Sequence, residues 1–259
     1  MKVTALECGI TIIDGALSQL FKDWGRNIAM ECVEDHEISM SDRWFDYACV
    51  YDTNFELIES SNTILKEYSQ TSETNLQAPY DGYRATYTKQ VSLLLDRLKL
   101  IDLSDLKSIE TWCNVSRRDL HLDKDETKSI DQSIKTEDWP MWCIATFPDL
   151  LERPAEETGG QLCILPDSSD KIPVYFDESD SDKPNWWLLK EEFWRRDMSN
   201  SNLLLAADDN WQQVEYKPDR IVVWPGNSMH FTVPVTTQKR RFSIPINCWP
   251  KVYGEDKVV

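Results

Sequence analysis

The sequence predicts a mainly β protein of the α+β class, in which an antiparallel sandwich or barrel packs against a helical N-terminal flank. After about residue 111, short apolar stretches of strand length alternate with loops rich in Pro, Gly, Asp and Asn. No helix of the kind that joins parallel strands separates these stretches. Before that point, residues 88–101 repeat apolar side chains at helical spacing. The change in pattern therefore predicts a flank over 1–108 and a β core over 109–259.

The composition narrows the possible partners and compartments. The chain has 259 residues, 41% of them hydrophobic, and eleven tryptophans, which suffice for a substantial core. Its 28 basic and 45 acidic residues give a net charge of −17, which repels nucleic acid and anionic membranes. No apolar run is long enough to span a bilayer. We therefore expect a cytoplasmic protein whose partners are neither nucleic acid nor membranes, and the sequence gives no indication of oligomeric state.

The cysteines indicate buried thiols and not a disulfide framework or a thiolate zinc site. Their number is odd and no CxxC pair occurs. They stand at positions 8, 32, 49, 113, 143, 163 and 248.

The flank is expected to be mainly helical. Residues 10–30 have apolar spacing compatible with a helix that ends near Gly25, and the segments 54–70 and 88–101 have the same period. The link 71–83 is polar and turn-rich. His36 is expected to be a surface histidine of this flank.

The core is expected to consist of seven short strands and one long insertion. The insertion, 167–210, is acidic at first and then tryptophan-rich, as in a lid, although an amphipathic helix over one sheet face fits it as well. The strand candidates are residues 111–123, 141–147, 161–166, 211–217, 220–224, 229–235 and 240–246.

The stretch from Arg220 to Trp249 predicts three strands of one sheet with a polar face. Pro225 and Gly226 suit the two central positions of a type II turn. In the strand that follows, alternation puts His230 on the face opposite Phe231, and in the next strand it separates Arg241 and Ser243 from the apolar residues. We therefore expect His230, Arg241 and Ser243 to point together to one side of this sheet.

Three residues form a candidate metal-binding set. His121 and Asp123 share one face at the end of a predicted strand, and His230 adds a second imidazole. Two neutral imidazoles and one carboxylate form a facial set that leaves three octahedral positions of iron(II) open. In the alternative interpretation the histidines are satisfied core residues and Arg241 is a surface ion pair. Asp125 and Glu126 compete for the carboxylate role, but solvated loop charges explain them better.

These residues resemble the pattern of the iron(II)- and 2-oxoglutarate-dependent oxygenases. That pattern is His121-x-Asp123, the distal His230, ten intervening residues, and then Arg241-x-Ser243. HFTVPVT, which begins at His230, is similar to the distal-histidine strand of the prolyl-hydroxylase-like branch. GGQL at 159–162 resembles its Gly-Gly-acid-Leu stretch, with Gln161 in place of the acid.

The resemblance implies a double-stranded β-helix, or jelly roll, with iron(II), 2-oxoglutarate and O₂ at one site. His121, Asp123 and His230 would hold the metal and take part in catalysis, while Arg241 and Ser243 would bind the distal carboxylate of 2-oxoglutarate. Arg240 is expected to face away, with Phe242. Halogenases of the family lack the carboxylate ligand, so the presence of Asp123 predicts no halogenation.

The implied function is that of an oxidoreductase, a dioxygenase that hydroxylates an unactivated C–H bond of a small molecule. The substrate would be an amino acid or a natural-product intermediate, and succinate and carbon dioxide would be released. Arg117, Trp186 and Trp187 are candidate substrate contacts. Three alternatives remain: a prolyl-type hydroxylase of peptides, a desaturase or cyclase with the same iron centre, and a metal-binding jelly roll without turnover.

Overall fold

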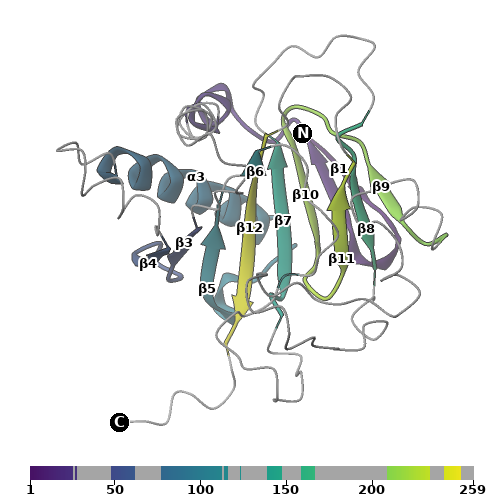
Figure 1. Cartoon of the computed structure of the whole chain (residues 1–259). Coiled ribbons are helices and arrows are strands. Elements are labelled where there is room, and N and C mark those ends of the chain that lie inside the picture. Colours follow the sequence, from purple (N-terminus) through teal and green to yellow (C-terminus); the bar gives the residue numbers. More distant parts are fainter. Residues whose placement is uncertain are drawn as a thin grey trace, which may run out of the picture.

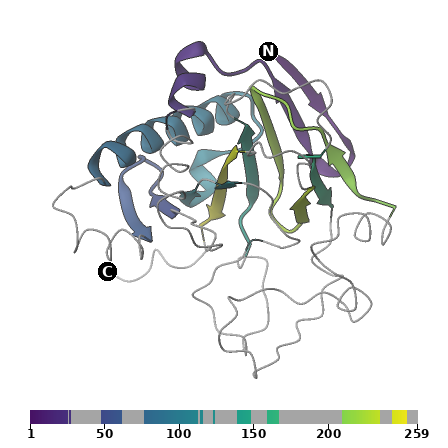
Figure 2. The same ribbon diagram turned by 45° about the horizontal axis from the view of Figure 1, so that its top comes forward.

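A computed structural model shows two antiparallel sheets and one long helix, α3 (Gln77–Arg97). The helix lies along one face of the larger sheet, and the smaller sheet lies against the opposite face of the larger sheet (Figure 1, Figure 2). The described residues are 1–25, 27, 48–61, 77–112, 114–115, 123, 139–147, 159–166, 209–233 and 242–251.

The larger sheet joins strands from both ends of the chain. Its order is β1-β2-β10-β7-β12-β5-β3-β4, with β6 beside β12, and each of these pairings is antiparallel. Its strands are β1 (Lys2–Ala5), β2 (Thr11–Asp14), β3 (Ala48–Tyr51), β4 (Leu57–Ser61), β5 (Leu106–Thr111), β6 (Asn114–Val115), β7 (Trp142–Phe147), β10 (Arg220–Pro225) and β12 (Phe242–Pro250).

The smaller sheet has the order β11-β8-β9 within the described part of the chain. Its strands are β8 (Leu162–Leu165), β9 (Gln212–Val214) and β11 (Met229–Thr232). From β7 onward the chain runs from the larger sheet to β8 and β9, back to β10, across to β11 and back to β12. Repeated crossing between two facing antiparallel sheets defines a jelly roll. The predicted fold class, a jelly-roll core with a helical flank, is confirmed.

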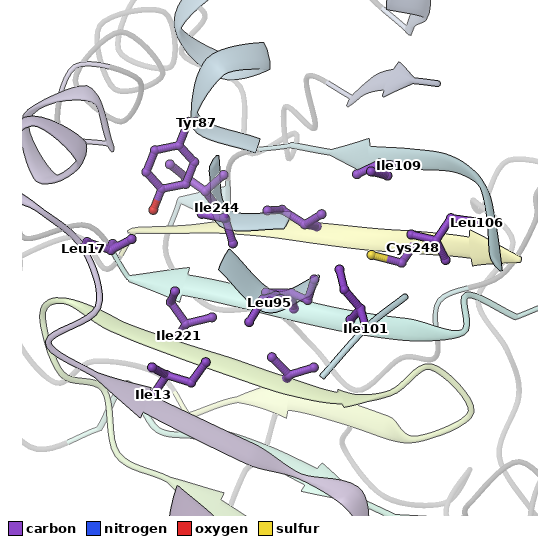
Figure 3. Packing of buried hydrophobic residues seen from close by; sticks show 14 residues of the cluster. Ile13, Leu17, Tyr87, Leu95, Ile101, Leu106, Ile109, Ile221, Ile244 and Cys248 are labelled. Atoms are coloured by element: carbon purple, nitrogen blue, oxygen red, sulfur yellow. The ribbon is translucent and has the colours of Figure 1, made fainter. Parts of the chain in front are cut away.

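The pleat of the larger sheet separates two cores. On the helix side, Ile144, Ile221 and Ile246 pack with Val91 and Leu95 of α3, all of them at most 1% exposed (Figure 3). Between the two sheets lies a second cluster, which also includes Ile10 and Tyr216 beyond the strands. Its members in the sheets are Cys143, Ala145, Phe147, Leu162, Ile164, Val214, Val222 and Trp224.

The flank contains more β structure than the sequence predicted. Residues 11–14 form β2 and residues 57–61 form β4, where we expected helices. Thr11, Ile12 and Ile13 of β2 are β-branched and alternate in burial, so pairing with β1 and β10 outweighs the helical spacing. The strand β4 carries Leu57 and Ile58 exposed on its edge, so its apolar residues do not mark a helix packed on the core.

The long helix begins earlier than predicted. It starts at Gln77, inside the link that we expected to be a polar turn, and extends through the predicted segment to Arg97. Its buried face is partly polar, because Arg84, Thr88 and Ser92 are at most 1% exposed. Of these residues Arg84 precedes the predicted segment 88–101, and a charged residue on the buried face hides the amphipathic period there. No helix in the described ranges has both the length and the apolar character needed to cross a bilayer.

The turn after β10 is displaced by one residue from the prediction. The Ser228 amide donates to the Pro225 carbonyl at 3.2 Å, which puts Gly226 and Asn227 at the central positions. Gly226 is required there by close approach, since an added Cβ would lie 1.9 Å from the Pro140 carbonyl oxygen. Pro225 is still paired with Trp142 in the sheet, so the turn begins only after it.

Candidate metal site

His230 faces the larger sheet from the strand β11. It pairs with Ile164 of β8, which belongs to the core between the sheets, and directly paired residues point to the same face. The prediction that His230 and Ser243 belong to a single sheet was wrong, and Arg241, which was predicted on the same side, lies outside the described residues. The strand β11 pairs with β8 and not with β12, so His230 and Ser243 belong to opposite sheets. Alternation fixes the face of a residue, but it does not fix which strand pairs with which.

A row of four side chains crosses the larger sheet on the face opposite His230. Glu110 pairs with Asn247, Asn247 with Cys143, and Cys143 with Trp224, on the adjacent strands β5, β12, β7 and β10. We call these four residues the inner row. Trp224 contacts the imidazole of His230 edge to face, with ring centroids 5.0 Å apart and an interplanar angle of 67°. The inner row is thus part of the surroundings of His230.

Asp123 and His230 come together in the interior. Asp123 Oδ2 lies 3.6 Å from His230 Nε2, and the two side chains are 11% and 8% exposed. His230 Nδ1 lies 3.2 Å from the Ser228 carbonyl oxygen. A carbonyl oxygen can only accept, so Nδ1 carries the hydrogen in this contact. In the neutral imidazole, Nε2 then presents its lone pair to the carboxylate.

Two lone-pair donors that face each other in a buried place require a positive charge between them or on the ring. The separation of 3.6 Å is too long for a hydrogen bond between Nε2 and Oδ2. A metal ion bound to one nitrogen and one carboxylate oxygen meets this requirement, and this donor set suits iron(II). The described residues of the site therefore fit a metal ion of this kind.

A thiol also contacts Asp123. Cys143 Sγ donates to Asp123 Oδ2 at 3.3 Å, and Cys143 is 1% exposed. Burial raises the pKa of the Cys143 thiol well above its usual range, and the negative charge of Asp123 raises it further. The side chain is therefore a thiol donor to the carboxylate, and the ligand set contains nitrogen and oxygen.

The structure describes some of the predicted site residues and not others. Asp123 and His230 are brought together, and Ser243 is 4% exposed on the same face of β12 as Asn247. Within the described ranges, no three His, Cys, Asp or Glu residues form a group that could hold a metal ion. Outside the described residues lie His121, Arg241, Arg117, Trp186, Trp187, the competitors Asp125, Glu126 and Arg240, His36, and most of the insertion 167–210.

Sequence reasoning missed Cys143 and Trp224, whereas alternation places Asn247 on the polar face with Ser243. Alternation within 141–147 places Cys143 on one face with Ala145 and Phe147, which was readable from the sequence. The identity of that face as the wall opposite His230 depends on strand order, which the sequence did not provide.

Comparisons with known proteins give similarity to solved structures alone. No protein-family model matches the sequence, and no curated protein matches it. A prolyl-4-hydroxylase from Pseudomonas putida aligns over 95% of this chain and 95% of its own, with a TM-score of 0.48 and 14% identity. HygX from Streptomyces hygroscopicus, with nickel and 2-oxoglutarate bound, covers 94% and 83% of the two chains, with a TM-score of 0.47 and 14% identity. AviO1 from Streptomyces viridochromogenes covers 94% and 90%, with a TM-score of 0.47 and 11% identity.

Proposed function

We propose that this protein is an iron(II)- and 2-oxoglutarate-dependent dioxygenase that hydroxylates an unactivated C–H bond of a small molecule. The observation that carries the proposal is the buried pair of Asp123 Oδ2 and His230 Nε2, 3.6 Å apart inside a jelly roll. These residues are 107 positions apart in the sequence, and the sequence pattern alone predicts both of them as ligands of one metal.

Asp123 and His230 would hold the metal, with His121 as the third ligand. When bound, iron(II) with 2-oxoglutarate and O₂ supplies the oxidising power that C–H hydroxylation requires. The protein orients its ligands for this purpose. The Ser228 carbonyl fixes the hydrogen on His230 Nδ1, and this contact directs Nε2 toward Asp123.

Arg241 and Ser243 would bind the distal carboxylate of 2-oxoglutarate. A guanidinium can hold a carboxylate through two parallel hydrogen bonds, and the serine hydroxyl can add one more. Ser243 supports this role because it is buried on the face of β12 that also carries Asn247, the face directed toward the smaller sheet. A local positive charge is needed to attract a dianion to a chain whose net charge is −17.

The interior between the sheets would keep water away from the reaction. Ile164 and Val222 are fully buried there and Trp224 is 2% exposed. The side chains of Asp123 and His230 are therefore bordered by apolar surface. Exclusion of water strengthens the grip of the charged groups and limits side reactions.

Turnover of 2-oxoglutarate tests the proposal. The protein is loaded anaerobically with iron(II) and 2-oxoglutarate, mixed with oxygenated buffer, and assayed for succinate with panels of free amino acids, natural-product intermediates and proline-containing peptides. We expect a member of the small-molecule panels to stimulate succinate release. Stimulation by peptides alone would show the prolyl-type alternative, and a desaturated or cyclised product would show a different outcome at the same centre. Metal binding without succinate in any panel would contradict the proposal.

Two neighbouring arginines provide a matched test of the 2-oxoglutarate site. Replacing Arg241 by Ala removes a bidentate charged contact, so we expect about a hundredfold weaker 2-oxoglutarate binding, while metal affinity stays nearly unchanged. Arg240→Ala serves as the control, because alternation directs Arg240 to the opposite face. Calorimetric titration of each metal-loaded variant measures both effects. Equal losses in the two variants would contradict the assignment of Arg241.

A further inference from the structure

We propose that Cys143 is a positioning residue, whose thiol holds the Asp123 carboxylate in the orientation in which it binds the metal together with His230. This inference rests on the proposed function, because it concerns Asp123 and His230, the proposed ligands of one metal ion. It assigns a role to a residue of the inner row that the ligand set does not use.

The contact itself is specific to one oxygen atom. Cys143 Sγ lies 3.3 Å from Asp123 Oδ2, which is also the oxygen that lies 3.6 Å from His230 Nε2. A thiol is a weak donor in water, but it is stronger in a buried site, where no solvent competes. Because a carboxylate rotates about its Cβ–Cγ bond, a donor to one oxygen restrains which oxygen faces the imidazole.

Cys143 is well suited to restrain its partner because its own position is fixed. It lies in β7, which is hydrogen-bonded on both sides, and it pairs with Asn247 on one side and Trp224 on the other. Its side chain is 1% exposed and is packed in the core between the sheets. The direction of the Cys143 thiol is therefore set by the sheet, and the Asp123 carboxylate rotates to accept its hydrogen bond.

The same arrangement is found at the other member of the pair. His230 donates from Nδ1 to the Ser228 carbonyl and contacts Trp224 through its ring. Trp224 and Cys143 are directly paired neighbours on β10 and β7. Both members of the pair thus take their orientation from adjacent positions of one sheet, as metal ligands commonly do from the groups around them.

A second buried thiol provides the matched control. Cys248 lies on β12, but it points to the helix side of the sheet, where it belongs to the core that includes Leu95 and Ile246. Burial raises the pKa of Cys248 to about 12. Cys248 is as buried as Cys143, but its side chain lies on the helix side of the larger sheet, away from Asp123 and His230.

The experiment separates hydrogen bonding from packing. Cys143 is replaced by Val, which is larger and has no donor, by Ala, which is smaller and has no donor, and by Ser, which keeps a donor. Cys248→Val is the control. Each full-length protein is titrated anaerobically with Co(II), and both the dissociation constant and the visible absorption of the bound ion are recorded, with the melting temperature of the metal-free protein as a check of folding.

We expect Cys143→Val and Cys143→Ala to bind Co(II) about tenfold more weakly than the unchanged protein, with an altered absorption spectrum. Cys143→Ser should recover at least half of the loss on a logarithmic scale, and Cys248→Val should bind like the unchanged protein. Undiminished binding by Cys143→Val would overturn the inference. So would equal weakening in the Ser and Val variants, or in Cys248→Val. Those results leave the proposed function standing, whereas absence of Co(II) binding by the unchanged protein would overturn both.

Discussion

The two faces of the larger sheet differ in chemistry although they belong to the same strands. The helix side of β7, β10 and β12 is almost wholly apolar and is covered by α3. The opposite side carries the inner row, two of whose members contact Asp123 and His230. Neighbouring residues of a strand alternate between these faces. Along each strand, residues that pack against α3 therefore alternate with residues that face the smaller sheet. Substitutions in the helix-side core should therefore change folding, and those that alter the contacts of the inner row with Asp123 and His230 should change metal binding.

The largest effect on folding is expected on the helix side. Leu95 of α3 is fully buried in that core, and Leu95→Ala should lower the free energy of unfolding by about 3.5 kcal/mol, through lost apolar contact and a residual cavity. Urea denaturation measures the loss. Co(II) affinity, measured well below the denaturation midpoint, should be unchanged, and a change of more than about threefold, which is 0.7 kcal/mol, would show that the two faces are not independent.

The converse effect is expected at His230. Replacement by Leu removes the proposed metal ligand and puts an apolar side chain of similar size into an apolar surrounding. Metal affinity should fall by more than about a hundredfold, which is 2.7 kcal/mol or more. The unfolding free energy of the metal-free protein should change by less than about 1 kcal/mol. A large loss of folding stability without metal would mean that His230 has a structural role instead.

A third prediction concerns an ion pair at the opposite end of β10 from Trp224. Arg220 donates from Nε and Nη2 to the two carboxylate oxygens of Asp14, at 2.7 and 3.0 Å. The hydrogen bond from Arg220, followed by its charge, lowers the pKa of Asp14 below its ordinary value of 3.8. Asp14→Asn should therefore cost about 2 kcal/mol of stability at neutral pH.

The pH dependence gives this prediction its sign. The folded-state pKa of Asp14 is depressed, so the stabilisation is fully present above the unfolded value and disappears as the pH falls through the folded value. The difference in unfolding free energy between the original protein and Asp14→Asn should shrink as the pH is lowered below about 4. A difference that stays constant down to pH 2 would show that the ion pair is not its source.

The smallest effect is expected at a polar contact between α3 and β7. The Tyr87 hydroxyl donates to Thr146 Oγ1 at 2.8 Å, and both residues are fully buried on the helix side. Tyr87→Phe should lower the unfolding free energy by about 1 kcal/mol, because the aromatic ring remains in place and one buried hydrogen bond is lost. Thermal denaturation measures it, and a loss above about 3 kcal/mol would indicate that the hydroxyl supports a larger network.

Three strands of the core were predictable because each is a short apolar run between turn residues. The single strand predicted over 111–123 was wrong, since β5 ends at Thr111 and β6 comprises Asn114–Val115. Residues 142–147, 162–165 and 220–225 form strands within one or two residues of the predicted bounds. The flank was less predictable, since the β-branched run of β2 also fits a helical period, and α3 buries Arg84 and Thr88, which obscure its apolar face. The local sequence pattern therefore predicted secondary structure correctly where the buried residues are apolar, and it failed where buried residues are polar.

The candidate site was predictable as a set of residue types and not as an arrangement. Asp123 and His230 were selected from their spacing to other residues, and the structure brings them together. The contact of Cys143 with Asp123 arises from a pairing between distant strands, and no spacing along the chain encodes it. Long-range register is decided by the fit of two whole sheets, which a single sequence does not reveal.

The most direct test of the metal site is an anomalous difference map from crystals loaded anaerobically with Co(II). The account predicts one strong peak at about 2.1 Å from His230 Nε2 and from a carboxylate oxygen of Asp123, with His121 as the third protein ligand. A peak elsewhere in the molecule, or a bound ion that leaves Asp123 and His230 in contact only with each other, would contradict it.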